Sequence, residues 1–183
     1  GTGFNATGGG TVNVLGAGNT ISSVSAVALN VSSTNIGASN MTFQSISAGN
    51  NTAAADPATG IALNTTGASG GLVVTGTGTT DGSGGTIQFI TNRGVEAIST
   101  SNLSLKNMTF TSANLADGAS CNASDNSACN AAIYLNTVTN ATLDNVDVNT
   151  TAEEGINVRN SSGLQLLNST LVNCGTASSG GDT

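Results

Sequence analysis

Short stretches of alternating apolar and polar residues recur along this chain, and four of them share one pattern. Each reads apolar, x, apolar, x, Asn, x, x, apolar. The four stretches are 36–43, 103–110, 141–148 and 164–171. Because alternation with period two places every second side chain on the same face, each stretch predicts two short β-strands separated by an Asn.

A second alternating pair of apolar residues lies shortly before each of these stretches. The pairs are Val27/Leu29, Val95/Ala97, Ile133/Leu135 and Ile156/Val158. The shortest repeat runs 23 residues, from Ile133 to Ile156, and the longer repeats carry insertions. Self-similarity of this kind is typical of solenoids, in which each unit buries the apolar face of the next. The pattern predicts an all-β fold, a parallel β-helix solenoid of about six turns.

One repeat departs from the pattern. It starts at Ile61, its second strand is expected at Leu72-Val-Val74, and Gly76 takes the place of the Asn. We expect an irregular turn there. Gly60, Gly94 and Gly155 each stand directly before the first apolar anchor of a repeat, where a bend with positive φ is plausible.

The Asn of the pattern is expected to have a structural role. An Asn side chain can bond the backbone at a tight corner and tolerates unusual backbone angles. Stacked repeats would then align these residues as an internal ladder, in which each amide bonds the copies above and below it. The residues predicted to form this ladder are Asn40, Asn107, Asn145 and Asn168.

The chain reads as one segment, residues 1–183, with regular repeats over about 20–175. Loop insertions are expected at about 48–59 and 113–131. Neither end has an obvious polar cap, which solenoids need, so we expect a segment of a longer polypeptide.

The composition of the chain mainly excludes some classes of function. Only 7% of the residues are charged and 3% are aromatic, and the net charge is −7 with three Lys or Arg. Without a basic patch, nucleic-acid binding is not expected. No long apolar run is present, so we expect no membrane insertion by this segment. Although Gly-rich polar composition can indicate disorder, apolar residues that keep their phase argue against it.

The strand–turn–strand–Asn pattern resembles the right-handed parallel β-helix repeats of the pectate-lyase-like superfamily. The version rich in Gly, Ser, Thr and Asn, with very few cations, is similar to autotransporter passengers and bacterial surface adhesins. The resemblance covers about residues 20–175. It implies a right-handed solenoid and an extracellular or cell-surface location.

Three cysteines bear on the compartment. Cys121 and Cys129 bracket a short segment of the 113–131 insertion, where a disulfide is geometrically reasonable and would indicate an oxidising environment. Two free thiols are the alternative. Cys174 is left over, either buried or paired outside this segment.

Enzymes of the resembled superfamily suggest one catalytic alternative, a polysaccharide lyase or glycoside hydrolase. Candidate groups lie along one acidic stretch of sequence, and the alternative interpretation of that stretch is a solvated edge with an ion pair. The candidates are Asp144, Asp147, Glu153, Glu154 and Arg159. The lack of His excludes an ordinary nucleophilic triad, and the sequence predicts no metal site and no cofactor.

Two further features remain open. Asn-x-Ser/Thr sequons are frequent, and those at Asn50, Asn64 and Asn122 lie in expected loops where a glycan would fit. A Thr-rich row at 75–80 suggests a third alternative, an ice-binding β-solenoid. We expect instead a structural or adhesive segment, such as a stalk, filament shaft or adhesin passenger. Its expected partners are neighbouring repeats, copies of the same protein, or host and cell-surface glycans or proteins.

Overall fold

The computed structural model describes residues 1–52, 57–117 and 129–177. This part of the chain contains sixteen strands and no helix, and every strand pairing is parallel. None of it forms a helix long and apolar enough to cross a membrane. The strands are β1 (Phe4–Thr7), β2 (Thr11–Val14), β3 (Thr20–Ser23), β4 (Leu29–Ser32), β5 (Asn35–Phe43), β6 (Ser45–Ala48), β7 (Thr59–Asn64), β8 (Leu72–Val74), β9 (Gly85–Gln88), β10 (Arg93–Lys106), β11 (Met108–Thr111), β12 (Ala131–Asp144), β13 (Asp147–Asn149), β14 (Glu154–Arg159), β15 (Ser162–Leu167) and β16 (Thr170–Val172).

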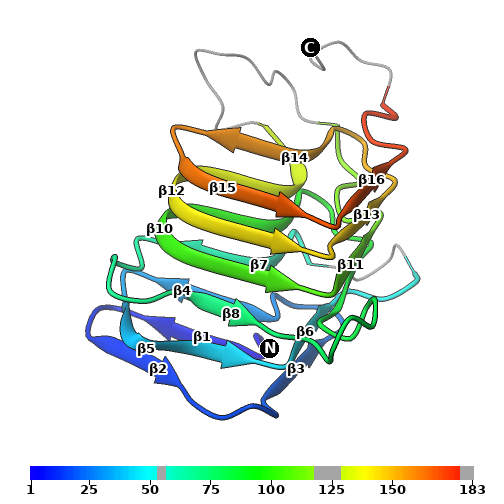
Figure 1. The fold of residues 1–183 in the computed structure, drawn as a ribbon. Helices are drawn as coiled ribbons and strands as arrows, with labels where there is room; N and C mark the ends of the chain where they lie inside the picture. Colours follow the sequence, from blue (N-terminus) through cyan, green and yellow to red (C-terminus); the bar gives the residue numbers. More distant parts are fainter. Residues whose placement is uncertain (53–56, 118–128, 178–183) are drawn as a thin grey trace.

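The strands stack in three columns, defined by their pairing (Figure 1). Column 1 contains β1, β4, β7, the first part of β10, the first part of β12, and β14. Column 2 contains β2, β5, β8, the later parts of β10 and β12, and β15. Column 3 is the separate six-stranded sheet of β3, β6, β9, β11, β13 and β16.

The sheet layout supports a stacked, all-parallel β fold, which is compatible with the expected solenoid. It does not by itself mark out six equal turns. The first sheet has ten strands because β10 and β12, fourteen residues each, run through both column 1 and column 2. Parallel strands require crossover connections, and here the chain makes each crossover by passing through the other columns.

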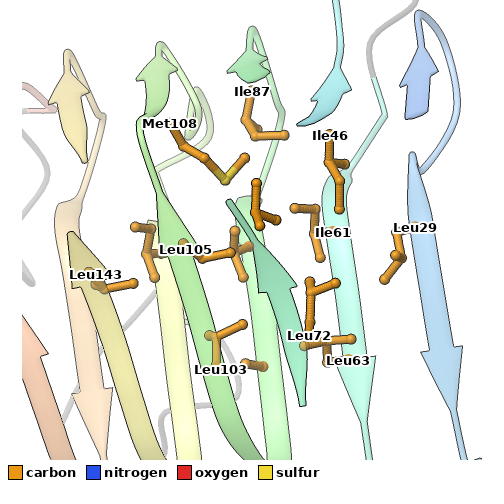
Figure 2. Close-up of a cluster of buried hydrophobic side chains, with 14 of the residues drawn as sticks. Leu29, Ile46, Ile61, Leu63, Leu72, Ile87, Leu103, Leu105, Met108 and Leu143 are labelled. Carbon is orange, nitrogen blue, oxygen red and sulfur yellow. The ribbon is translucent and has the colours of Figure 1, made fainter. Parts of the chain in front are cut away.

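Apolar side chains from all three columns fill the interior (Figure 2). Leu29 and Ile61 enter from column 1, Leu105 from column 2, and Ile87 and Met108 from column 3, and all are fully buried. Each fully buried aliphatic side chain contributes about 1.5–3 kcal/mol relative to exposure. The rows of like residues are therefore the main attraction between neighbouring repeats.

The register corrects the alignment of the first repeat in column 1. Leu29 pairs with Ile61, and Ile61 pairs with Val95. The first inward pair is therefore Leu29/Val31 rather than Val27/Leu29. Alternation alone does not reveal this error, because a shift of two residues keeps each side chain on the expected face.

Left-handed backbone conformations mark the corners between columns. After column 1, the equivalent residue of five successive repeats has a positive φ, and these residues are Ser33, Thr65, Ser99, Thr137 and Asn160. The left-handed conformation costs a non-glycine residue about 1–2 kcal/mol of conformational free energy, and it costs Asn the least. Repeated tight corners explain why the chain is rich in Asn, Gly, Ser and Thr.

The glycines before the first apolar residues of column 1 are not required by a bend with positive φ, as expected, but by close packing. Gly60 and Gly94 do not have a positive φ. A Cβ on Gly60 would lie 2.6 Å from the carbonyl oxygen of Gly94, and one on Gly94 would lie 2.5 Å from that of Ala132. Close stacking of backbones, not an unusual bend, requires glycine at these positions.

Candidate functional site

Four of the five residues of the acidic stretch lie on strands of three different columns, and Glu153 lies just before β14. Asp144 ends β12, Asp147 begins β13, and Glu154 and Arg159 begin and end β14. Arg159 pairs in register with Asn136, whereas Asp144 pairs with Leu167, so these two residues lie at different corners. Among the described residues, no group of three or more His, Cys, Asp or Glu side chains could hold a metal ion.

Asp144 contacts Lys106 instead of Arg159. Lys106 Nζ lies 3.4 Å from Asp144 Oδ2, and Asn168 Nδ2 donates to Asp144 Oδ1 at 2.9 Å. The hydrogen bond from Asn168 has the largest effect and lowers the pKa of Asp144. Desolvation opposes it with a smaller effect, and the hydrogen bond and the charge of Lys106 each lower the pKa further. The carboxylate is therefore held in its ionised form.

These residues line an open groove of about 410 Å³ at the corner between columns 2 and 3. Thr79, Asn107 and Asn145 complete its lining. The loop between β8 and β9 forms one side, since Asn107 Nδ2 donates to the Gly78 carbonyl at 3.0 Å. The groove combines one cation, one carboxylate and several amides, a surface suited to polar, hydroxyl-bearing groups.

The expected Asn ladder is only partly assembled at this corner. Asn145 Nδ2 donates to Asn107 Oδ1 at 2.8 Å, and both residues have a positive φ. Asn145 Nδ2 also lies 2.7 Å from Asp81 Oδ1. Asn168 has the same backbone conformation but bonds Asp144 rather than Asn145. Asn107 is fully buried, whereas Asn168 is exposed.

Asn40 belongs to a different corner from the other three. Met41 pairs with Leu72 and Val73 pairs with Ser104, which places Asn40 at the position of Asn102, just before column 2. Its Oδ1 accepts from the backbone N–H of Gly71 at 3.0 Å. The 36–43 stretch matches the repeat pattern, but stacking aligns Met41 and Phe43, not Ile36 and Ala38, with the later inward pairs of column 2. Ile36 is also buried in the core, where it pairs with Val12.

Glu153 is buried and connects both ends of the 113–131 insertion. Its backbone N–H donates to Asn114 Oδ1 at 2.7 Å, and its Oε2 accepts from the backbone N–H of Asn130 at 2.8 Å. Asn114 Nδ2 also donates to the Asn92 and Ala116 carbonyls. Glu153 therefore anchors both ends of this loop and does not line the groove at Lys106 and Asp144.

A second polar cluster, which the sequence pattern did not indicate, lies on the outer face of column 1. Arg93 is buried, its Nη1 lies 2.6 Å from Glu96 Oε2, and its Cζ lies 3.9 Å from the centre of the Tyr134 ring. Its Nε and Nη2 donate to the Cys129 carbonyl at 2.9 and 2.7 Å. We call Arg93, Glu96, Tyr134 and Cys129 the arginine cluster.

Simple alternation does not predict this cluster, because two consecutive residues near the start of β10 both face the interior. The positions of Gly94 and Val95 both face the interior, next to Phe110 and in the core respectively. Arg93 is thereby turned to the outer face, beside Glu96 and Tyr134. The sequence feature that could have pointed to the arginine cluster is the rarity of Arg and Tyr in this chain.

The Cys121–Cys129 disulfide stays a prediction, because Cys121 lies outside the described residues. Cys129 itself is fully buried, with Ala131 and Tyr134. Cys174 is free and packs against the core beside Gly155, where a Cβ would lie 2.7 Å from its Sγ.

Asn50 and Asn64 do not line the groove, whereas Thr79 of the Thr row does. Asn64 ends β7 and is exposed, and Asn50 Oδ1 accepts from the N–H and hydroxyl of Thr52. Asn122 is outside the described residues. Residues 75–80 follow β8 in the loop that leads to β9, so this Thr row is not part of a strand.

Comparison with known protein families finds no matching family model, and comparisons with curated proteins and with solved structures find no significant match. The fold and the contacts above therefore define the class that is established: an all-β chain of stacked, parallel strands.

Proposed function

We propose that this chain is a segment of right-handed parallel β-helix, about six turns long, with a structural and adhesive role in an extracellular or cell-surface protein. A stalk, a filament shaft and an adhesin passenger are forms of that role. The observation that supports it is the continuity of the apolar rows. Row after row joins repeats that are far apart in sequence.

In this proposal the loops present the adhesive surface. The base of the 113–131 insertion is tied to the stack by Glu153, Asn114 and the arginine cluster. A loop held in this way loses less conformational entropy when it binds a partner. The 48–59 insertion is the second candidate surface.

Binding under flow tests the adhesive role. Beads carrying the chain are passed over arrays of glycans and extracellular proteins, beside beads whose 118–128 segment is replaced by a Gly-Ser linker of equal length. We expect retention by the first beads and loss by the second. A variant in the distant groove, Lys106→Met, is the matched control. Equal retention of the linker variant would contradict the proposal.

A polysaccharide lyase or hydrolase is the second candidate, and the groove with Lys106 and the ionised Asp144 favours it. Incubation with acidic and neutral polysaccharides, followed by assay of new reducing ends and unsaturated products, separates the two roles. We expect no product above that of Asp144→Asn. Product that disappears in this variant would replace the structural proposal with an enzymatic one.

The extracellular location is tested through cysteine chemistry. Mass spectrometry of the unreduced protein, made in an oxidising compartment, is expected to find Cys121 linked to Cys129. Detection of both as free thiols would remove this support for an extracellular location.

A further inference from the structure

The polar groove lies on the side of the stack, at the corner where β10 leads into β11 and β12 leads into β13 (Figure 1). Its lining comes from segments that are far apart in sequence, and every lining residue is polar. The lining residues are Thr79 in the loop between β8 and β9, Lys106 and Asn107 at the end of β10, Asp144 and Asn145 at the end of β12, and Asn168 after β15. Because successive repeats stack along the groove, a ligand reaches it from the side and neither end of the stack has to be open.

The loop between β8 and β9 forms a fixed wall of this groove. Ser83 Oγ accepts from the backbone N–H of Thr77 at 2.8 Å and donates to the Thr80 carbonyl at 2.6 Å. Asp81 Oδ1 accepts from Asn145 Nδ2 at 2.7 Å, which ties the loop to the corner after β12. A wall that is already held in place loses little conformational entropy when a ligand binds.

The groove offers more hydrogen-bond acceptors than donors. The amide nitrogens of Asn145 and Asn168 donate to the carboxylates of Asp81 and Asp144, whereas their Oδ1 atoms accept no hydrogen bond from any described residue of the chain. These two carboxylates and the one ammonium, that of Lys106, give the region a net charge of −1. A ligand that fits must therefore donate hydrogen bonds, and a negative charge on it is unfavourable.

Hydroxyl groups match this set of side chains, because each hydroxyl can donate to an amide or carboxylate oxygen and can also accept a hydrogen bond. An oligosaccharide presents many hydroxyl groups on rigid rings. A peptide is a poorer fit, since peptide and protein recognition relies on apolar or aromatic anchors in pockets and no lining residue of the groove is apolar. An acidic saccharide would be repelled by the net negative charge of the region.

We propose that the groove binds a neutral oligosaccharide through its hydroxyl groups and does not cleave it. Asp144 and the amide oxygens of Asn145 and Asn168 accept from the ligand, and the Thr79 hydroxyl donates to it. Hydrolysis of a glycosidic bond requires a protonated carboxyl group as the acid, whereas Lys106 and Asn168 hold Asp144 as a carboxylate. A neutral saccharide also lacks the carboxyl group beside which a lyase removes a proton. This site goes beyond the proposed structural and adhesive role, which places binding on the loops.

Binding is tested in solution, because no aromatic ring lines the groove to stack on a sugar and a single site of this kind is too weak to hold a bead against flow. The chain is titrated at low salt with cellohexaose, mannohexaose and chitohexaose as neutral probes and with hexagalacturonate as the acidic probe, and binding is followed by NMR. We expect at least one neutral probe to bind at least tenfold more tightly than hexagalacturonate. Mass spectrometry is expected to recover that probe intact.

Two variants and a control locate the binding in the groove. Asp144→Asn and Asn145→Gly, in which Gly tolerates the positive φ, are each expected to weaken binding of that probe about fivefold, as the loss of one hydrogen bond would. Circular dichroism checks that each is folded, and one folded variant is sufficient for the test. Asp117→Asn changes an exposed carboxylate in the 113–131 insertion, away from the groove, and should bind as the wild type does.

Four results would overturn the proposed site. They are the absence of binding by all three neutral probes, equal or tighter binding of hexagalacturonate, cleavage of a neutral probe, and undiminished binding by the folded groove variants. The absence of binding would leave the stacked fold and the proposed role of the loops standing, because neither depends on the groove.

Discussion

Arg93 and Lys106 each form an ion pair on the outside of the stack, but their surroundings differ. The Arg93–Glu96 pair has a separation of 2.6 Å, and its side chains are 10% and 26% exposed. The Lys106–Asp144 pair has a separation of 3.4 Å, and its side chains are 40% and 23% exposed. Arg93 also contacts an aromatic ring and a carbonyl, whereas Lys106 borders an open groove.

The difference indicates that this chain uses its few cations for different purposes. A planar guanidinium can satisfy a carboxylate, a carbonyl and a ring face together, so Arg93 joins β10 to the residues before β12. A solvated ammonium contributes little to stability and remains available to a ligand. The arginine cluster is therefore a structural anchor, and the groove is the more accessible polar surface.

Removal of the buried cation is expected to have the largest effect. Arg93→Ala leaves the Glu96 carboxylate and the Cys129 carbonyl without their donor, and we expect a loss of about 3 kcal/mol in the free energy of unfolding. Urea denaturation measures it. Arg93→Lys keeps the charge but not the planar guanidinium, so its free energy of unfolding should lie between those of the wild type and Arg93→Ala. A loss below about 0.5 kcal/mol in Arg93→Ala would remove the distinction between the two pairs.

Removal of the Tyr134 ring beneath Arg93 is expected to have the next largest effect on the free energy of unfolding. Tyr134→Leu keeps an apolar side chain but removes the ring face, at a cost of about 1–2 kcal/mol including the cation–π contact. Tyr134→Phe keeps the ring and is the control, with a small change in the urea midpoint. If the two variants lost the same stability, the hydroxyl rather than the ring would be responsible.

Removal of the exposed cation, Lys106, is expected to change the free energy of unfolding less than either of these substitutions. Lys106→Met should lower the free energy of unfolding by less than about 1 kcal/mol, because solvent and salt screen the pair. The difference from the wild type should shrink further as salt is added to the urea titration. A loss of about 3 kcal/mol would mean that both pairs act as anchors.

The smallest effect concerns the pH dependence of Asp144. Its pKa is lowered in the folded state, so its contribution is present above the unfolded-state pKa and is lost as the pH falls through the folded-state pKa. Asp144→Asn should therefore be slightly less stable than the wild type at neutral pH and equal to it in acid. Thermal unfolding across this range measures the difference, and a gap that persists in acid would contradict it.

Much of the fold was predictable because burial follows the alternation. The pairing of Ile61, Val95, Ile133 and Ile156, expected from the repeat, is confirmed by the register. Gly76 does occupy the position of the corner Asn, with φ of 58° and its Cβ position crowded by Asn107. These expectations held because identical local patterns make identical strands and corners.

The candidate site was less predictable, because it depends on contacts between distant segments. The acidic residues are neighbours in sequence, but short strands and corners carry Asp144, Asp147 and Glu154 onto three different columns. Asp144 finds its cation in Lys106, 38 residues earlier, because β10 and β12 pair in register. Sequence proximity is a poor guide to proximity across a stack of repeats.

The amino-acid sequence by itself determined the all-β architecture, the inward rows and the need for small residues at tight corners, since each follows from local periodicity and backbone sterics. Only the tertiary structure decided that Asn40 leaves the corner of Asn107, that Glu153 anchors a loop, and that Arg93 contacts Tyr134. The physical reason is register. It is set by the packing of whole repeats, and a local pattern that fits several alignments cannot choose between them.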